Sequence, residues 1–201
     1  MAAFHEQRRY SDSYHLSIHR AHEMDFLAHY HGEVELFFVQ RGVQKLGINN
    51  QVLTLSAGQI GVVAPWHIHY YEAAGPVRGY MLIFDPDIMG RHFPTRSGLW
   101  TFDPDGDSFS VLSDLLQQLH DEIKVKHTYY ELAASSLLNR FFVSLFRADK
   151  AYPFDEMLTE GPKQHELMQD VLTYLAGNFQ DPISRDGRSE EHTSELQSPN
   201  T

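Results

Sequence analysis

Two histidines and a carboxylate stand close together in one short segment of this chain. His29 and His31 are two residues apart, and Glu35 follows four residues later. Because side chains alternate between the two faces of an extended strand, all three would point to the same face. Imidazole nitrogens and a carboxylate oxygen on one face can hold a divalent metal ion. They can equally hydrogen-bond the hydroxyl groups of a small polar ligand, so the pattern leaves two chemistries open.

Short strand-like runs surround this segment and would position it. Between Tyr14 and Phe84, several runs of strand length are separated by turn-forming residues. We expect strands over 14–20, 26–30, 34–40, 44–48, 51–55, 60–64, 69–73 and 77–84. The expected turns are at Gly42, Asn49-Asn50, Ala57-Gly58 and Gly75-Pro76. This spacing predicts an all-β sandwich or barrel whose inward-facing residues line a cavity.

Two amphipathic helices are predicted after the strands, over 108–125 and 131–147. Apolar residues recur there at spacings of three and four, and the second helix is rich in phenylalanine. We favour a helical hairpin that packs against its own barrel, with a homodimer contact through the same pair as the second interpretation. The residues assigned to that dimer contact are Leu112, Leu116, Leu119, Leu138, Phe142 and Leu145.

Composition and charge limit the class of protein. The 201 residues carry a formal net charge of −11, which argues against this segment wrapping nucleic acid by itself. The absence of cysteine excludes disulfides and a thiolate nucleophile. No phosphate-binding loop and no nucleophile motif is present, so we expect no enzyme activity. No signal peptide or membrane-length apolar run is present, so we expect a cytoplasmic protein without membrane contact.

The histidine segment resembles the first motif of the cupin superfamily. The resemblance consists of His29-x-His31, then three intervening residues before Glu35, and six more before Gly42. It implies a cupin barrel, also called a double-stranded β-helix, followed here by the helical pair. The fold class that we expect is therefore mainly β with C-terminal helices.

The stretch from Gly58 through Ala64-Pro65 to His69 resembles the second cupin motif, with Trp66 and His67 altering the usual proline–glycine spacing. In the family, the second motif contributes a further histidine to the pocket of the first motif, so the resemblance implies that His69 lies with His29, His31 and Glu35. A metal ion, if bound, would be held by His29, His31, Glu35 and His69. With such an ion the chain would be a metal-dependent cupin enzyme, a dioxygenase or a sugar isomerase, which is the alternative to a sensing function.

Sensory cupins mostly resemble metal-free pockets, so we expect no cofactor. In that interpretation aromatic faces stack on a sugar-like effector while histidine and glutamate bind its hydroxyls. The expected ligand-binding residues are His29, His31, Glu35, Trp66, His69, Tyr71 and Tyr80.

A later segment, from Leu167 to Ser184, resembles the first helix of the DNA-binding domain of AraC-type transcription regulators. These regulators contain a cupin sensor, a helical pair, a linker and two helix-turn-helix units. The resemblance implies a sensing and dimerisation module, with DNA contacted only through a C-terminal domain absent from this chain. The predicted parts are the barrel with an N-terminal arm (1–106), the helical pair (107–148), a linker (149–163), the first DNA-binding helix (164–184) and a tail (185–201).

The tail does not resemble a protein domain. Residues 188–198 are polar apart from Leu196, have no apolar stripe, and resemble the translation of a common sequencing-adapter oligonucleotide. We therefore expect residues 185–201 to be a non-native or disordered extension.

Overall fold

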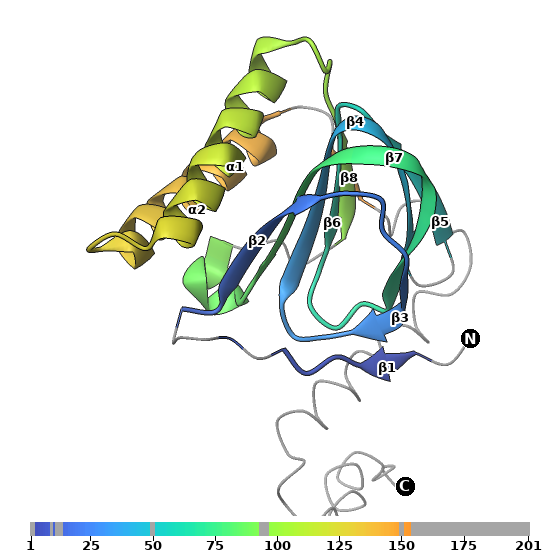
Figure 1. Ribbon diagram of the computed structural model, residues 1–201, viewed down its shortest axis with the longest axis horizontal. Helices are drawn as coiled ribbons and strands as arrows, with labels where there is room; N and C mark the ends of the chain where they lie inside the picture. Colours follow the sequence, from blue (N-terminus) through green and yellow to red (C-terminus); the bar gives the residue numbers. More distant parts are fainter. Residues whose placement is uncertain are drawn as a thin grey trace, which may run out of the picture. The chain divides into compact units, whose positions relative to one another are not determined.

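A computed structural model describes residues 3–8, 10, 14–48, 51–92, 97–148 and 151–153. Strands dominate the first part and two helices follow (Figure 1). The strands are β1 (Phe4–His5), β2 (Leu16–Ala21), β3 (Phe26–Tyr30), β4 (Val34–Ile48), β5 (Gln51–Ser56), β6 (Gln59–Val63), β7 (His69–Phe84), β8 (Gly98–Thr101) and β9 (Ala151–Pro153). The helices are α1 (Asp107–Val125) and α2 (Tyr130–Arg147), with short 3₁₀ turns at Pro86–Ile88 and Gly90–His92. The predicted Asn49-Asn50 turn, the helix over 164–184 and the tail lie outside the described residues.

Two long antiparallel strands, β4 and β7, organise the sheet. The first half of β4 pairs with β6 and with the second half of β7, while its second half pairs with β5 and with the first half of β7. β2 joins the second half of β7, and β3 joins its first half. Each long strand therefore takes part in both walls of a rolled sheet, and the two walls face one another as a barrel (Figure 1).

The turns predicted at Gly42 and Gly75-Pro76 are bends inside these long strands. Gly42 has a φ of +82°, and the pairing between β4 and β7 shifts register on either side of it. A Cβ on Gly42 would lie 1.8 Å from the Pro76 carbonyl oxygen, so only glycine fits. The prediction that the chain reverses at Gly42 is wrong. A glycine at positive φ is favoured both in a tight turn and in a β-bulge, so the residue type alone does not distinguish them, and here it forms a bulge.

Both faces of the central sheet are buried. Alternation along β4 directs Phe37 and Val39 into the barrel, where they pack in one apolar cluster with Tyr71. Leu36 and Phe38 point the other way, into a second cluster formed with α1 and α2. This arrangement explains the continuous apolar run 36–39, because a strand covered on both sides needs no polar face.

The two helices pack on the outer face of this sheet (Figure 1). Phe38 stacks on Phe109 of α1 with ring centroids 4.8 Å apart, and Phe84 meets Phe142 of α2 at 5.5 Å. The helical pair therefore packs against its own barrel, as the favoured interpretation expected. The six residues assigned to a dimer contact are at most 1% exposed and belong to the core of their own chain, so they are not available to a partner: Leu112, Leu116, Leu119, Leu138, Phe142 and Leu145.

Three short strands, β1, β8 and β9, were not predicted. β1 pairs in parallel with the end of β3, which places the N-terminal arm beside the histidine segment. β9, inside the predicted linker, pairs with β8 at the edge of the sheet. Neither α1 nor α2, nor any other helix in the described ranges, has the length and apolarity that a membrane crossing needs.

The buried helix face generates a stability prediction. Replacement of Leu116 (0% exposed) by alanine should lower the free energy of unfolding by about 2–5 kcal/mol, because it leaves a cavity between α1 and the sheet. The matched control is Leu132→Ala on α2, where the side chain is 69% exposed and a change within about 0.5 kcal/mol is expected. Urea unfolding measures both variants, and equal effects would contradict the packing described.

Candidate functional site

Four buried polar side chains meet at one end of the barrel. They are His29 at the end of β3, His31 in the following loop, Glu35 in β4 and His69 at the start of β7. One potential ligand atom of each lies within 4.8 Å of those of the others, and each residue is only 1–2% exposed. Pairing of His29 with His69 between β3 and β7 brings the two sequence motifs together. The four residues are called the histidine cluster below.

Glu35 is the centre of the hydrogen bonds in the histidine cluster. His31 Nε2–H donates to Glu35 Oε2 at 3.0 Å, and the Tyr71 hydroxyl donates to Glu35 Oε1 at 2.6 Å. Burial raises the pKa of the Glu35 carboxyl, but the neighbouring His69 and His31 outweigh it and hold that pKa well below its usual range. Burial and the Glu35 charge raise the pKa of Tyr71 well above its usual value. Glu35 is therefore an ionised acceptor, and Tyr71 is a neutral donor.

His31 lies between two carboxylates. Its Nδ1 is 3.3 Å from Glu33 Oε2, on the side opposite its hydrogen bond to Glu35. Burial lowers the pKa of His31, but Glu33 and Glu35 together raise it to about 9, so the ring is an imidazolium at neutral pH. Glu33 was not predicted as a site residue. The signal that the sequence offered was a carboxylate two residues from His31 and two residues from Glu35.

The other two imidazoles are oriented by backbone carbonyls. His29 Nδ1 lies 2.8 Å from the Leu27 oxygen, and His69 Nδ1 lies 2.9 Å from the His67 oxygen. A carbonyl only accepts, so Nδ1 carries the proton in both rings and each Nε2 faces the cluster. Burial and the nearby His69 lower the pKa of His29 to about 4, which leaves its Nε2 with a free lone pair at neutral pH.

This donor set suits a divalent transition metal ion. Three imidazole nitrogens and one carboxylate oxygen are ligands that zinc, manganese, iron and nickel accept. The buried His69 Nε2 makes no hydrogen bond within the part of the chain that the structure describes. Orientation of a ligating histidine through a bond from its other nitrogen to a carbonyl is the arrangement that metal sites use. His29, His31, Glu35 and His69 could therefore hold such an ion, provided that His31 loses its proton.

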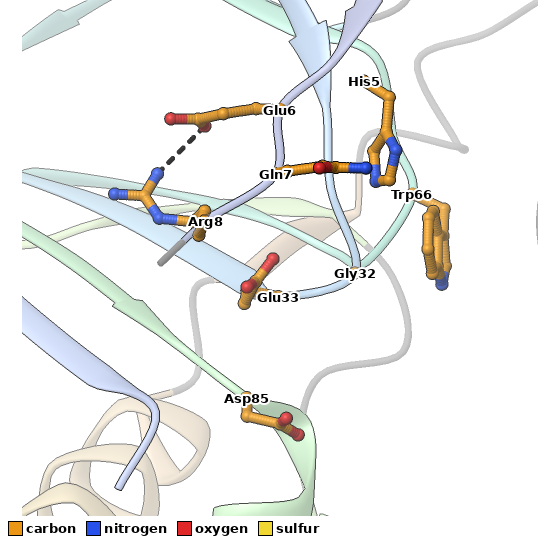
Figure 2. A pocket seen from close by; sticks show the side chains of 8 residues that line it. All are labelled: His5, Glu6, Gln7, Arg8, Gly32, Glu33, Trp66 and Asp85. Carbon is orange, nitrogen blue, oxygen red and sulfur yellow. Dashed lines mark hydrogen bonds and ion pairs between the residues drawn. The ribbon is translucent and has the colours of Figure 1, made fainter. Parts of the chain in front are cut away.

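Gly32 and Glu33, which follow His31 in the chain, line a cavity of about 540 Å³, and none of the four residues of the histidine cluster is among its lining residues (Figure 2). Trp66, one of the expected ligand-binding residues, lines this cavity, and its backbone N–H donates to the His31 oxygen at 2.7 Å. Glu6 and Arg8 of the N-terminal arm face each other at the cavity wall in Figure 2, and the Arg8 guanidinium donates to Glu6 Oε2 at 3.0 Å. The remaining lining residues are His5, Gln7, Gly32, Glu33 and Asp85.

Tyr80 does not join the other expected site residues. Its hydroxyl donates to Gln117 Oε1 of α1 at 2.6 Å, and its ring packs in the cluster between the sheet and the helices. The sequence suggested two strands, 69–73 and 77–84, with independent faces. Because β7 is one strand, Tyr71 and Tyr80 have opposite parity and point to opposite sides. His29, His31, Glu35, His69 and Tyr71 come together, and Trp66 lies at the adjoining cavity.

Comparisons with known proteins add a family and a fold. The family described as AraC-like ligand binding domain matches residues 13–142. This match, together with the rolled sheet and the following helices, confirms the expected cupin barrel. A comparison with curated proteins finds no match.

Several solved structures are similar over part of the chain. A conserved protein of unknown function from Streptococcus pyogenes is 14% identical, with 42% of this chain and 81% of that one covered and a TM-score of 0.34. A cupin-2 domain containing protein from Shewanella frigidimarina is 23% identical, with 37% and 72% covered and a TM-score of 0.30. Oxalate decarboxylase from Bacillus subtilis is 17% identical, with a TM-score of 0.32; 36% of this chain is covered but only 22% of the decarboxylase.

The position of His31 between two carboxylates generates a pH prediction. Its pKa in the folded chain, about 9, exceeds the ordinary value of 6.5, so its contribution to stability is complete below pH 6.5 and is lost as pH rises towards 9. The metal-free protein should lose up to about 3 kcal/mol of unfolding free energy over that interval. Urea unfolding in the presence of a chelator measures the loss.

The matched variants for this prediction are His31→Gln and His15→Gln. The first removes the titrating group, so the decline between pH 6.5 and 9 should disappear. His15 contacts Asp85 with a side chain that is 48% exposed, and its replacement should leave the decline intact. A wild-type stability that is flat over the interval would contradict a charged His31.

Proposed function

The chain belongs to the family of AraC-like ligand binding domains, and from that premise we propose that it is the effector-sensing part of a transcription regulator. One observation supports the proposal most strongly. Three histidines and a glutamate are buried together beside a cavity, although a barrel that served only as a scaffold would be filled with apolar side chains. Such convergent polar groups beside a pocket are typical of a small-molecule site.

The proposed effector is a small hydroxylated molecule, such as a sugar. A cavity of about 540 Å³ is large enough for one, and Trp66 provides an aromatic surface for the C–H face of a sugar ring. Glu6 and Glu33, which line the cavity, supply acceptors for hydroxyl groups, and His5 supplies a donor or an acceptor. The effector would lie under the N-terminal arm and next to the histidine cluster.

Occupancy of the cavity would be transmitted through contacts between the barrel and the helices. The Tyr14 hydroxyl lies 2.9 Å from Ser135 Oγ of α2, and Arg20 donates to Gln117 of α1 at 2.7 Å. An effector that binds one arrangement more tightly than another shifts the population between them. DNA binding by a further C-terminal domain, homodimerisation and a cytoplasmic location belong to this proposal. Apolar side chains that remain exposed on the helices could meet a second copy: Val111, Leu132, Val143 and Phe146.

Thermal unfolding against a panel of sugars and related metabolites tests the proposal. An effector present at 100 times its Kd should stabilise the chain by about 2.7 kcal/mol, which raises the Tm by about 5–10 °C. Glu35→Gln should remove most of that shift because the amide cannot accept from both His31 and Tyr71 as the carboxylate does. Glu72→Gln, which changes an exposed partner of Lys45, is the control and should keep the shift.

Two results would contradict the effector proposal. The first is a panel in which no compound raises the Tm of the wild-type protein. The second is a compound whose effect is the same in the wild type and in Glu35→Gln, because it would then bind away from the histidine cluster.

A metal-dependent enzyme, a dioxygenase or a sugar isomerase, is the second candidate function. The observation that favours it is the pair of carbonyl-anchored rings, His29 and His69, whose Nε2 atoms face the same small space as Glu35. A bound ion would supply Lewis-acid or redox chemistry there, while these residues would hold and orient it.

Elemental analysis of untagged protein separates the two candidates. The enzyme candidate predicts about one transition metal ion per chain, loss of that ion in His29→Ala, and retention in the control His15→Ala. It also requires turnover of a sugar or consumption of dioxygen by the loaded protein. The sensing proposal expects no turnover, so measurable turnover that His29→Ala abolishes would decide for the enzyme.

A further inference from the structure

A second cavity, of about 430 Å³, has two arginines in its wall. Arg41 comes from β4 and Arg78 from β7, and the loop that joins β2 to β3 contributes the other charged or polar groups, His22 and Glu23. Arg41 follows Glu35 by six residues of the same strand, which is roughly 20 Å along β4. The cavity shares no lining residue with the cavity of Figure 2, so it is a separate site.

The two arginines stand directly opposite each other on neighbouring strands. Arg41 and Arg78 are register partners in the antiparallel pairing of β4 with β7, so their Cβ atoms are about 5 Å apart on one face of the sheet. Both side chains are exposed, and neither makes an ion pair or a side-chain hydrogen bond with a residue in the described ranges, Glu23 included. Like charges placed in this way repel each other. In a chain with 27 acidic and 16 basic residues, the packing of the sheet does not explain why two cations lie together without a carboxylate partner.

The strands are in close backbone contact on both sides of the arginine pair. On one side, a Cβ on Gly42 would lie 1.8 Å from the Pro76 carbonyl oxygen. On the other side, a Cβ on Gly79 would lie 1.7 Å from the Phe38 oxygen. The two guanidinium groups are therefore presented from a rigid part of the sheet, which is the support that a binding site needs.

The loop that completes the cavity is anchored to the same two strands. Gln44 is buried in β4, and its side-chain amide donates to the Met24 oxygen at 2.8 Å and to the Glu72 oxygen at 2.9 Å. The Ala73 backbone N–H of β7 donates to Asp25 Oδ1 at 2.6 Å. These bonds hold the loop in place beside the arginines, so the cavity wall is formed before a ligand arrives.

A phosphate group has the chemistry that this wall would bind. Each guanidinium presents its N–H donors as a planar fork that matches two oxygens of a phosphate. A phosphate monoester carries about two negative charges near neutral pH, so one group offsets the charge of both arginines. The repulsion within the pair is then replaced by the attraction of both side chains to a shared anion.

The rest of the wall suits a carbon skeleton with hydroxyl groups. Pro76 and Val77 contribute apolar atoms, and His22 and Glu23 contribute hydrogen-bonding groups from the loop. The volume of about 430 Å³ falls within the range of small-molecule sites and leaves space beyond a phosphate ion.

We propose that Arg41 and Arg78 form a second ligand site, which binds the phosphate group of a small phosphate monoester such as a sugar phosphate. An ester held by both arginines links β4 to β7, the two long strands that also carry Glu35 and His69. The inference goes beyond the proposed function and does not depend on it, since the two cavities have no residue in common.

The test uses glucose 6-phosphate, inorganic phosphate and glucose as probes of the full chain, with sodium chloride at matched ionic strength. Titration calorimetry gives the affinity, and backbone amide NMR locates the site. Glucose 6-phosphate should bind once per chain and shift the amide signals of residues 41 and 78. Inorganic phosphate should shift the same signals with roughly tenfold or more lower affinity, because it lacks the contacts of the sugar. Glucose and sodium chloride should leave these signals unchanged.

Three variants separate a built site from a general response to charge. Arg78→Gln should weaken binding of glucose 6-phosphate by roughly tenfold or more, because a charge-assisted bidentate contact is lost. Arg78→Lys should also weaken it, since lysine keeps the charge but not the fork. Arg140→Gln removes an exposed arginine of α2 outside the cavity, and it should bind as the wild type does. Arg78→Gln also relieves the repulsion with Arg41, so without ligand its Tm should be no lower than that of the wild type.

The contrary outcomes each overturn the inference. If no phosphate compound shifts the signals of residues 41 and 78, or if Arg78→Gln and Arg140→Gln weaken binding equally, no phosphate site exists there. If inorganic phosphate binds as tightly as glucose 6-phosphate, the pair holds an adventitious ion only. If the signals of His29, His31 and His69 shift instead, the ester occupies the proposed effector site. Failure of this inference leaves the effector proposal standing, because that proposal is tested through Glu35→Gln.

Discussion

The ionised Glu35 carboxylate inside the barrel is the constraint on which the rest of the site depends. A buried charge is costly unless it is paired and hydrogen-bonded, and Glu35 meets this requirement through hydrogen bonds from His31 and Tyr71. Glu35 and these partners come from three different segments, so the fold must bring β4, β7 and the loop after β3 together. The long bent strands bring these segments together because β7 begins with His69 in one wall of the barrel and then continues alongside β4 into the other wall.

Local periodicity was sufficient to predict much of this arrangement. Alternation placed His29, His31 and Glu35 on one face, and the spacing of apolar residues gave both helices to within one residue. His69 joined the expected set through its resemblance to a second motif, and the structure brings it within the cluster. The helices were predictable because each depends on the geometry of a single element, whereas His29, His31 and Glu35 come from β3, the following loop and β4.

The features that sequence patterns did not give depend on contacts between distant segments. Glu6 lies beside His29 only because a two-residue strand pairs with β3, and no periodic pattern marks that pairing. Tyr80 was placed on the wrong face because Gly75 bends a strand instead of ending it. An apolar helix stripe cannot indicate whether it packs on its own sheet or on a second chain, and Leu116 packs on its own sheet.

Direct observation of the three imidazoles by nitrogen NMR at pH 7 is the most immediate test of the central claim, that a polar, pre-oriented recognition centre is built around Glu35. The account predicts that His29 and His69 carry a proton on Nδ1, and that His31 is protonated on both nitrogens. If His31 were neutral, or if His29 and His69 carried their protons on Nε2, the hydrogen bonds described would not exist and the account would be contradicted.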